Sequence, residues 1–308
     1  MNLMHLKYAI EIAKAGSLNK AAENLCVGQP NLSRAIKELE SSLGITIFHR
    51  STRGMVPTMQ GEEFLMYAKR ALREIDEIEN LYKTGAPPKQ EFSVSVPRAS
   101  YIALAFAEFS KCINNDEPFE IFYKETNAQR AIKNILESDY HLGIVRFSEK
   151  NSYYFMQMLD EKGLAGDTVT DFTYKIVMSK NHPLAKKDNI RFSDLESFTE
   201  IAHADPYVPS LPMSAVRKEE LPDNIQKRIF VFERASQFEL LSTNFNTFMW
   251  VSPVPKQVLD RFGLVEKSCA DNTKVYRDML IYRKSYSLSD LDKKFIEKLC
   301  KAKKEFVG

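Results

Sequence analysis

The hydrophobic pattern of the first 44 residues predicts three short helices. Apolar residues recur at helical spacing over 3–15, "AGS" at 15–17 interrupts them, and Ser17 is a suitable N-cap for a second helix over 18–25. A third helix is predicted over 28–44, "GQPNLSRAIKELESSLG". Its apolar stripe advances in steps of four, three and four residues: Leu32, Ile36, Leu39 and Leu43. Two short helices joined by a tight turn form a helix-turn-helix arrangement, here over about residues 18–37.

The polar face of the third helix carries the residue types that contact DNA. The major groove admits one helix, where Gln or Asn pairs with adenine and Arg favours guanine, and the N-terminal end of that helix usually reaches the base edges. The residues predicted to contact bases are Gln29, Pro30, Asn31, Ser33 and Arg34. The residues predicted to meet phosphates are Lys37, Arg50 and Arg53. The alternative interpretation is an outer helix face that is merely solvated.

An alternating pattern and then a long helical pattern follow. The stretch 45–58, "ITIFHRSTRGMVPT", predicts a two-stranded hairpin, or wing, with a basic turn that suits a phosphate backbone. From Thr58 a helix is predicted to about Tyr82. Its apolar seam, with heptad spacing, is Phe64, Ala68, Ala71, Ile75, Ile78 and Tyr82. Such a seam predicts dimerisation, and the alternative is packing on another domain of the same chain.

Beyond the stiff segment "TGAPPKQ" at 84–90, strands and helices alternate. The pattern predicts the α/β class, with parallel sheets covered by helices, and a second unit of the same kind beginning near residue 163. The chain ends in a strand, "YRDMLIYRK", and an amphipathic helix from Leu288 to about Lys304.

Composition and charge narrow the function classes. Of the 308 residues 44% are hydrophobic and 27% charged, which is typical of globular proteins. The net charge is only +2, yet residues 1–58 carry seven Lys or Arg against four Glu, so a polyanion would meet a locally basic domain. Charged residues interrupt the N-terminal pattern, and the longest apolar run, "YIALAFA", is too short for a membrane span. We therefore expect a cytoplasmic protein without membrane association.

Catalytic and metal-binding signatures are not found. The four cysteines, Cys26, Cys112, Cys269 and Cys300, are widely separated, which favours reduced thiols over a redox-sensing pair such as Cys112 with Cys269. Neither a phosphate loop nor a nucleophile–base set is present, so we expect no enzyme, no cofactor and no metal. The alternative is a solute-binding or enzymatic α/β protein with an incidental helical N-terminus.

The run "GSLNKAAENLCVGQPNLSRAIKELESSLGITIFHR", followed by "TRG", "PT" and Gly61, resembles the winged helix-turn-helix of LysR-type transcriptional regulators. Weaker similarity extends over "LGIVRF", "HPLA" and "LSDLDKKFIEKL". Two departures stand out. Gly28 replaces the Ser or Thr that is usual before the Gln, and "NFNTFMWVSP" replaces a Gly-rich segment.

The resemblance implies a domain layout. A winged helix-turn-helix at 1–58 would precede a dimerising, coiled-coil linker helix and hinge at 59–88. An effector domain at 91–308 would have two α/β lobes resembling periplasmic binding proteins. Lobe one would comprise 91–161 and 266–308, and lobe two 162–265.

The resemblance also implies an effector site. In two-lobed α/β folds a ligand lies where loops leave the carboxyl ends of strands, and helix N-termini there favour anions. The loops are "PRAS", "ETNA" and "HADPY", and Ser100 and Thr126 resemble the family's usual ligand donors. Further candidates are Arg98, Arg146, His203 and Thr247. Ser100 could instead be a plain helix cap, Arg146 a structural ion pair and His203 a core histidine. The expected effector is a small molecule, with an anion as a guess.

Together these features predict a transcriptional regulator modulated by an effector. A dimer or tetramer would bind an interrupted inverted repeat in double-stranded DNA, and RNA polymerase would be a partner. A sequence-indifferent architectural DNA binder is the remaining alternative.

Overall fold

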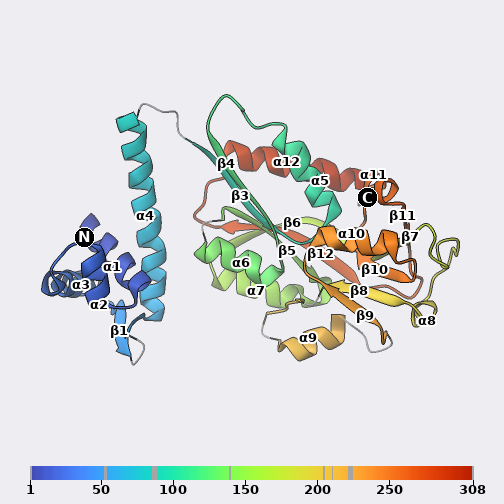
Figure 1. Cartoon of the computed structure of the whole chain (residues 1–308), viewed down its shortest axis with the longest axis horizontal. Coiled ribbons are helices and arrows are strands. Elements are labelled where there is room, and N and C mark those ends of the chain that lie inside the picture. The colour runs from blue at the N-terminus through green and yellow to red at the C-terminus, as the bar shows by residue number, and fades with distance from the viewer. Residues whose placement is uncertain are drawn as a thin grey trace. The chain divides into compact units, whose positions relative to one another are not determined.

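The computed structural model describes residues 2–51, 54–84, 89–138, 140–203, 205–209, 211–220 and 225–306. The chain divides into two compact units, Met1–Lys89 and Gln90–Gly308, which we call unit 1 and unit 2 (Figure 1). Within the described ranges, none of the helices combines the length and the apolar character that a membrane span requires.

Unit 1 contains the predicted helices and hairpin. Its elements are α1 (Leu3–Ala15), α2 (Leu18–Asn24), α3 (Gln29–Leu43), β1 (Phe48–Ser51), β2 (Gly54–Pro57) and α4 (Met59–Thr84). Ser17 caps α2 as predicted, because its Oγ accepts the N–H of Lys20. Gly44 ends α3 in the left-handed conformation, with φ 69°. The structure also corrects the apolar stripe of α3, since Ala35 is buried whereas Leu43 is 38% exposed.

Backbone contacts fix the hairpin against the helices. The N–H of Met55 donates to the carbonyl of Gly16, 2.8 Å away. The Glu40 carboxylate accepts the N–H groups of Ile47 and Phe48 at 2.7 and 3.1 Å. A Cβ at Gly61 would lie 2.0 Å from the carbonyl oxygen of Ile47, so only glycine lets α4 approach the hairpin this closely. The position of the wing is therefore specified by the backbone bond to Gly16, by the Glu40 carboxylate and by the close approach at Gly61.

The predicted seam of α4 divides into two parts. Phe64 packs against the core of unit 1 and Ala68 is 3% exposed, so the structure assigns both to the folding of their own unit. Ala71 and Ile75 are half-buried. Ile78 is 56% and Tyr82 81% exposed in the single chain, and dimerisation through them stays a prediction.

The first sheet of unit 2 has the strand order β4-β3-β5-β12-β6. Its strands are β3 (Gln90–Val96), β4 (Phe119–Glu125), β5 (Leu142–Ser148), β6 (Leu164–Thr173) and β12 (Val275–Arg283). Helices α5 (Ser100–Ser110) and α12 (Asp290–Phe306) contribute to the core on one face. Helices α6 (Ala128–Glu137) and α7 (Ser152–Glu161) contribute to the core on the other face, and a 3-10 turn (Glu149–Asn151) precedes α7. We call this part lobe one.

The second sheet has the order β11-β7-β10-β8-β9 and forms the centre of lobe two. Its strands are β7 (Lys175–Ser179), β8 (Thr199–His203), β9 (Arg228–Val231), β10 (Thr247–Val251) and β11 (Leu264–Lys267). Its helices are α8 (Phe192–Leu195), α9 (Met213–Glu220), α10 (Arg234–Thr243) and α11 (Lys256–Phe262). Alternating residues of β7 and β10 divide between two cores, one on each face of the sheet.

Two expectations about unit 2 need correction. The sheets are mixed, because β12 runs antiparallel to both β5 and β6, and β7 runs antiparallel to β10 and β11. The chain also crosses between lobes later than predicted. Residues 164–173 form an edge strand of lobe one, paired with β12 along its whole length, and only after Tyr174 does β7 begin lobe two. The return crossing lies between β11 and β12, over 268–274 rather than near 266.

Candidate functional site

The polar face of α3 points away from the core of unit 1. Leu32, Ala35, Ile36 and Leu39 are buried, and this holds the opposite face toward solvent. Of the predicted base-contacting residues, Pro30, Asn31 and Arg34 are exposed, whereas Gln29 and Ser33 are half-buried.

The predicted phosphate contacts lie beside that face. Lys37 and Arg50 are exposed, and within the described part of the chain neither they nor Arg34 makes an ion pair. Arg53 lies outside the described residues. Arg50 pairs across the hairpin with Met55, so its position is tied to the wing. The exposed cations suit the phosphate contacts that position a protein on DNA.

Unit 2 contains a cavity of about 480 Å³ lined by both lobes. Residues that follow β3 and β4 line it from lobe one, and the carboxyl end of β8 lines it from lobe two. This is the location that the strand order of an α/β fold favours for a ligand. Four of the residues predicted to bind an effector, Arg98, Thr126, Arg146 and His203, line the cavity, and effector binding by them stays a prediction.

Two predicted residues lie elsewhere. Ser100 does not line the cavity; it is the first residue of α5 and is 5% exposed, while Ala99 occupies the N-cap. Thr247 is fully buried, and its hydroxyl donates to the carbonyl of Asn244 in the turn before β10. We therefore leave both out of the candidate site.

Other lining residues were not among the predicted site residues, although Asn127 and Tyr207 belong to the loops "ETNA" and "HADPY" that were predicted to form the site. They include Asn127, Tyr174, Tyr207, Glu219, Glu220, Gln237, Trp250 and Lys274. Glu219 and Glu220 belong to α9, a helix that the sequence analysis did not find. Trp250 lies in β10, and Tyr174 lies between β6 and β7. The amphipathic spacing around Val216 was the one available signal for α9.

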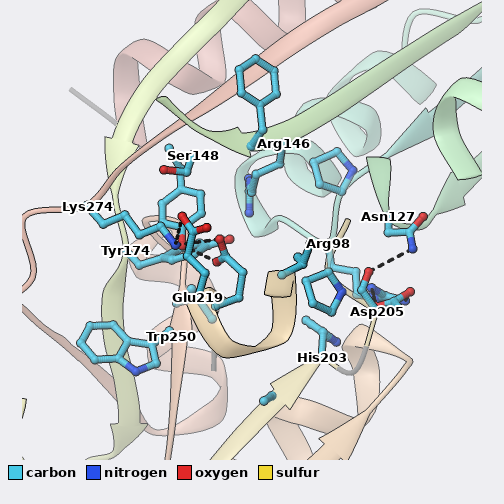
Figure 2. Close-up of a pocket in the computed structure, with 18 of the residues that line it drawn as sticks. Arg98, Asn127, Arg146, Ser148, Tyr174, His203, Asp205, Glu219, Trp250 and Lys274 are labelled. Atoms are coloured by element: carbon cyan, nitrogen blue, oxygen red, sulfur yellow. Dashed lines mark hydrogen bonds and ion pairs between the residues drawn. The ribbon is translucent and has the colours of Figure 1, made fainter. Parts of the chain in front are cut away.

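Arg98 connects the two lobes. Its guanidinium donates to both carboxylate oxygens of Asp205, at 3.0 and 3.3 Å, and to the carbonyl of Phe232 at 2.7 Å. Asn127 donates to the carbonyl of Asp205 (Figure 2). A further ion pair, Arg234 with Glu125 at 2.6 Å, joins lobe two to the end of β4. These contacts hold the two lobes together beside the cavity.

Arg146 makes a buried ion pair, as the structural interpretation of this residue predicted. It donates to the two oxygens of Asp278 at 2.7 and 2.6 Å, and Asp278 has no exposed surface. The Tyr101 hydroxyl donates to the same carboxylate, and burial together with Asp278 raises the pKa of Tyr101. The Arg146 guanidinium also lies 4.7 Å from the centre of the Phe172 ring. The charge of Arg146 is therefore balanced within the protein.

His203 presents an uncharged ring to the cavity. Its Nδ1 lies 2.9 Å from the carbonyl oxygen of Val231, which can only accept, so Nδ1 carries the hydrogen. Burial, and secondarily the nearby Arg98 charge, lowers the pKa of His203 to about 4. At neutral pH the other nitrogen, Nε2, is consequently a hydrogen-bond acceptor.

The third cation of the lining, Lys274, is also paired. Its Nζ donates to Glu220 at 2.7 Å, and Glu220 in addition accepts the hydroxyl of Tyr276. Figure 2 shows Lys274 beside Tyr174 and Glu219. Glu219 is farther from any cation, 3.9 Å from Lys274 and 3.6 Å from Lys150. Among the described residues, no group of His, Cys, Asp and Glu is placed to hold a metal ion.

The alternative of a redox pair, Cys112 with Cys269, is not seen as a disulfide in the structure. All four cysteines are free thiols, with Cys269 buried in lobe two and Cys112 at the end of α5 in lobe one. Burial raises the pKa of the Cys269 thiol, which disfavours the reactive thiolate.

Comparison with known proteins identifies a matching family and several relatives. Residues 3–62 match the family described as bacterial regulatory helix-turn-helix protein, lysR family. Over 269 residues the chain is 25% identical to the transcriptional regulator AlsR of Bacillus subtilis (strain 168), covering 86% of this chain and 83% of AlsR. Over 83 residues it is 39% identical to the regulator BenM of Acinetobacter baylyi, covering 27% of each.

The fold of the whole chain is also similar to that of a solved structure. The chain is similar to full-length LysG of Corynebacterium glutamicum, solved with its effector Arg, with a TM-score of 0.62 at 12% identity over 100% of this chain and 99% of LysG. A helix-turn-helix of the lysR type is thus followed by the two-lobed fold seen in a full-length LysR-type protein. Residues 3–62 therefore form a helix-turn-helix domain of the lysR family, and the chain as a whole is similar to DNA-binding transcriptional regulators of the LysR type.

Proposed function

We propose that the chain acts in the cytoplasm as a dimer or tetramer that reads an interrupted inverted repeat through α3. RNA polymerase is its further partner, and a small molecule in the cavity of unit 2 alters DNA binding. The observation that carries the proposal is the exposed polar face of α3, with Arg34, Lys37 and Arg50 free of ion pairs among the described residues. A dimer would place two such helices on one face of DNA, at half-sites separated by multiples of ~10 bp.

The cavity supports the regulatory part of the proposal. A ligand can shift a protein between two arrangements only if it binds one of them more tightly. The cavity is lined by both lobes, so a bound molecule would contact both and would favour one arrangement of the lobes. Regulation by a small molecule is the role that this geometry supports, and that the chain is not an enzyme is part of the proposal.

The DNA-binding part can be tested with the purified full-length protein. Genomic DNA fragments that the protein enriches would first identify an inverted repeat. The affinity of the protein for that repeat and for a scrambled control would then be measured at two salt concentrations. Gln29→Ala or Arg34→Ala should reduce discrimination by ~1–3 kcal/mol, because each removes a base contact. Lys37→Ala or Arg50→Ala should weaken both sequences alike and flatten the salt dependence. Ser41→Ala, exposed near the far end of α3, is the matched control.

Two results would contradict the proposal. The first is an affinity that shows no preference for the repeat. The second is a loss of affinity with Arg50→Ala that equals the loss with Gln29→Ala on every sequence, which would indicate an architectural DNA binder.

The effector role can be tested with Ala202→Leu, which would fill part of the cavity, since Ala202 lines it and is 6% exposed. That variant should bind DNA normally and lose its response in a promoter reporter.

A further inference from the structure

We propose that the cavity of unit 2 selects a small organic cation, an amine, amidinium or guanidinium compound, and discriminates against carboxylates. This inference rests on the proposed effector role of the cavity and specifies the chemical class of its ligand. The proposed ligand class differs from the anion that the sequence alone suggests. Three independent features of the lining support it.

The first feature is an unpaired acceptor. Gln237 on α10 lines the cavity and is 4% exposed. Its Oε1 is buried and has no hydrogen-bond partner among the described residues. Because a buried acceptor is costly to leave unpaired, a ligand that brings an N–H group is favoured here. His203 Nε2 is a second hydrogen-bond acceptor on lobe two while its ring is neutral.

The second feature is the pairing of the three cations that line the cavity. Arg98 is bound by Asp205, Arg146 by Asp278, and Lys274 by Glu220. A ligand carboxylate would have to compete with a protein carboxylate for each of them. Breaking an existing pair that is buried and bidentate, as it is for Arg146, costs more free energy than a new pair with the ligand carboxylate would return.

The third feature is the excess of acidic groups. Five carboxylates line the cavity, those of Glu200, Asp205, Glu219, Glu220 and Asp271, against the three cations already named. Three of the five are paired, Glu200 with Arg228, Asp205 with Arg98 and Glu220 with Lys274, and Asp271 accepts the backbone N–H of Phe192. Glu219 has capacity for another partner. Its carboxylate is 26% exposed, lies 3.6 Å and 3.9 Å from its nearest cations, and accepts no hydrogen bond within the described residues.

Aromatic side chains complete the cation site. Tyr174, Tyr207 and Trp250 line the cavity, and Figure 2 shows Trp250 and Tyr174 on the same side as Glu219. Aromatic faces attract organic cations through their ring quadrupoles and accept planar apolar groups equally well. The favoured ligand accordingly joins a cationic head to a flat or short apolar body.

The test uses three probes of one shape and different charge: benzamidinium, benzamide and benzoate. Trp250 is the single tryptophan of the chain and lines the cavity, so its fluorescence reports binding to the full-length protein. Benzamidinium should bind at millimolar concentration, at least about tenfold more tightly than benzoate, with benzamide between them. Butylammonium and butyrate provide an aliphatic pair, for which the same order is expected.

Two variants locate the interaction. Glu219→Gln should weaken benzamidinium about tenfold and leave benzamide nearly unchanged, because only the charge is removed. Gln237→Leu should weaken both probes, because both donate an N–H group. Glu239→Gln is the matched control, an exposed carboxylate on α10 that does not line the cavity.

The inference is overturned if both anions bind more tightly than the cations, if neither cation binds, or if Glu219→Gln has no larger effect than Glu239→Gln. DNA titrations in the same samples separate this outcome from failure of the proposed function. Binding of a cation with no change in DNA affinity would contradict the effector role alone. A DNA response to carboxylates but not to cations would contradict the present inference alone.

Discussion

Replacing Gly28 by Ser supplies the hydroxyl that the N-cap of α3 lacks. Gly28 has φ −68° and ψ 131°, an extended conformation that serine adopts without strain, and it makes no side-chain cap. A Cβ there would lie 3.8 Å from both Asn31 Nδ2 and Pro30 Cδ, which is ordinary van der Waals contact. The hydroxyl could accept the N–H of Asn31, which now bonds only the Gly28 carbonyl at 3.0 Å.

The expected gain can be estimated from two contributions. Ser exceeds Gly at an N-cap by a few tenths of a kcal/mol. Removing a glycine also reduces the entropy of the unfolded chain, which is worth ~0.4–1 kcal/mol at a compatible position. Taking the lower part of that range, because Gly28 is exposed at the end of a helix, we expect a total stabilisation of unit 1 below about 1 kcal/mol.

Hydrogen exchange of the full-length protein would measure this gain locally. Peptides from α2 and α3 should exchange up to about fivefold more slowly, and peptides from unit 2 should not change. Gly28→Ala is the control, since it removes the same entropy without adding a hydroxyl, and alanine is a much poorer cap than glycine. Faster exchange in Gly28→Ser would refute the reasoning, because it would mean that α3 begins at another residue.

Three further predictions concern other parts of the chain. Gly61→Ala should destabilise unit 1 by ~1–3 kcal/mol or more, because its Cβ would lie 2.0 Å from the Ile47 carbonyl oxygen; urea denaturation followed by exchange of α4 peptides would show it. Ile78→Asp should shift self-association toward monomers in sedimentation without lowering the stability of unit 1, because this side chain is 56% exposed in the single chain. His203→Asn should reduce the pH dependence of unit 2 stability. The pKa of His203 falls from 6.5 to about 4 on folding, so the unfolded chain binds a proton that the native chain does not, and stability is lost as pH falls through that window. Equal slopes for the variant and the wild type would contradict the assignment.

Unit 1 could be predicted almost completely because its determinants are local. The Ser17 cap, the glycine at the end of α3 and the apolar stripe lie within a few residues of the structure that they specify. The exception is instructive. Phe64 and Ala68 have heptad spacing, yet they pack within unit 1, since spacing identifies an apolar face but not the surface that covers it.

For unit 2 only the α/β class could be predicted from the sequence, because its strands pair with strands that are far away along the chain. β6 was placed in the wrong lobe because its partner, β12, begins a hundred residues later in the chain, and a strand carries no local signal of its neighbour. The mixed sheets have the same origin. Periodicity indicated strands and helices, and the alternation favoured parallel pairing, but the returning β12 enters the sheet between β5 and β6 in the opposite direction.

The charge that a ligand would carry is equally hard to predict from the sequence, because it depends on the long-range partners of single side chains. Loops after parallel strands meet at one edge, so Arg98, Thr126 and His203 could be placed at the cavity from the sequence. Whether an arginine there is free to bind an anion depends on a carboxylate far along the chain. Asp205 for Arg98 and Asp278 for Arg146 are such partners, and neither follows from spacing. A motif can thus predict where a ligand would bind, whereas the sign of that ligand's charge would follow only from which side chains the completed fold leaves unpaired.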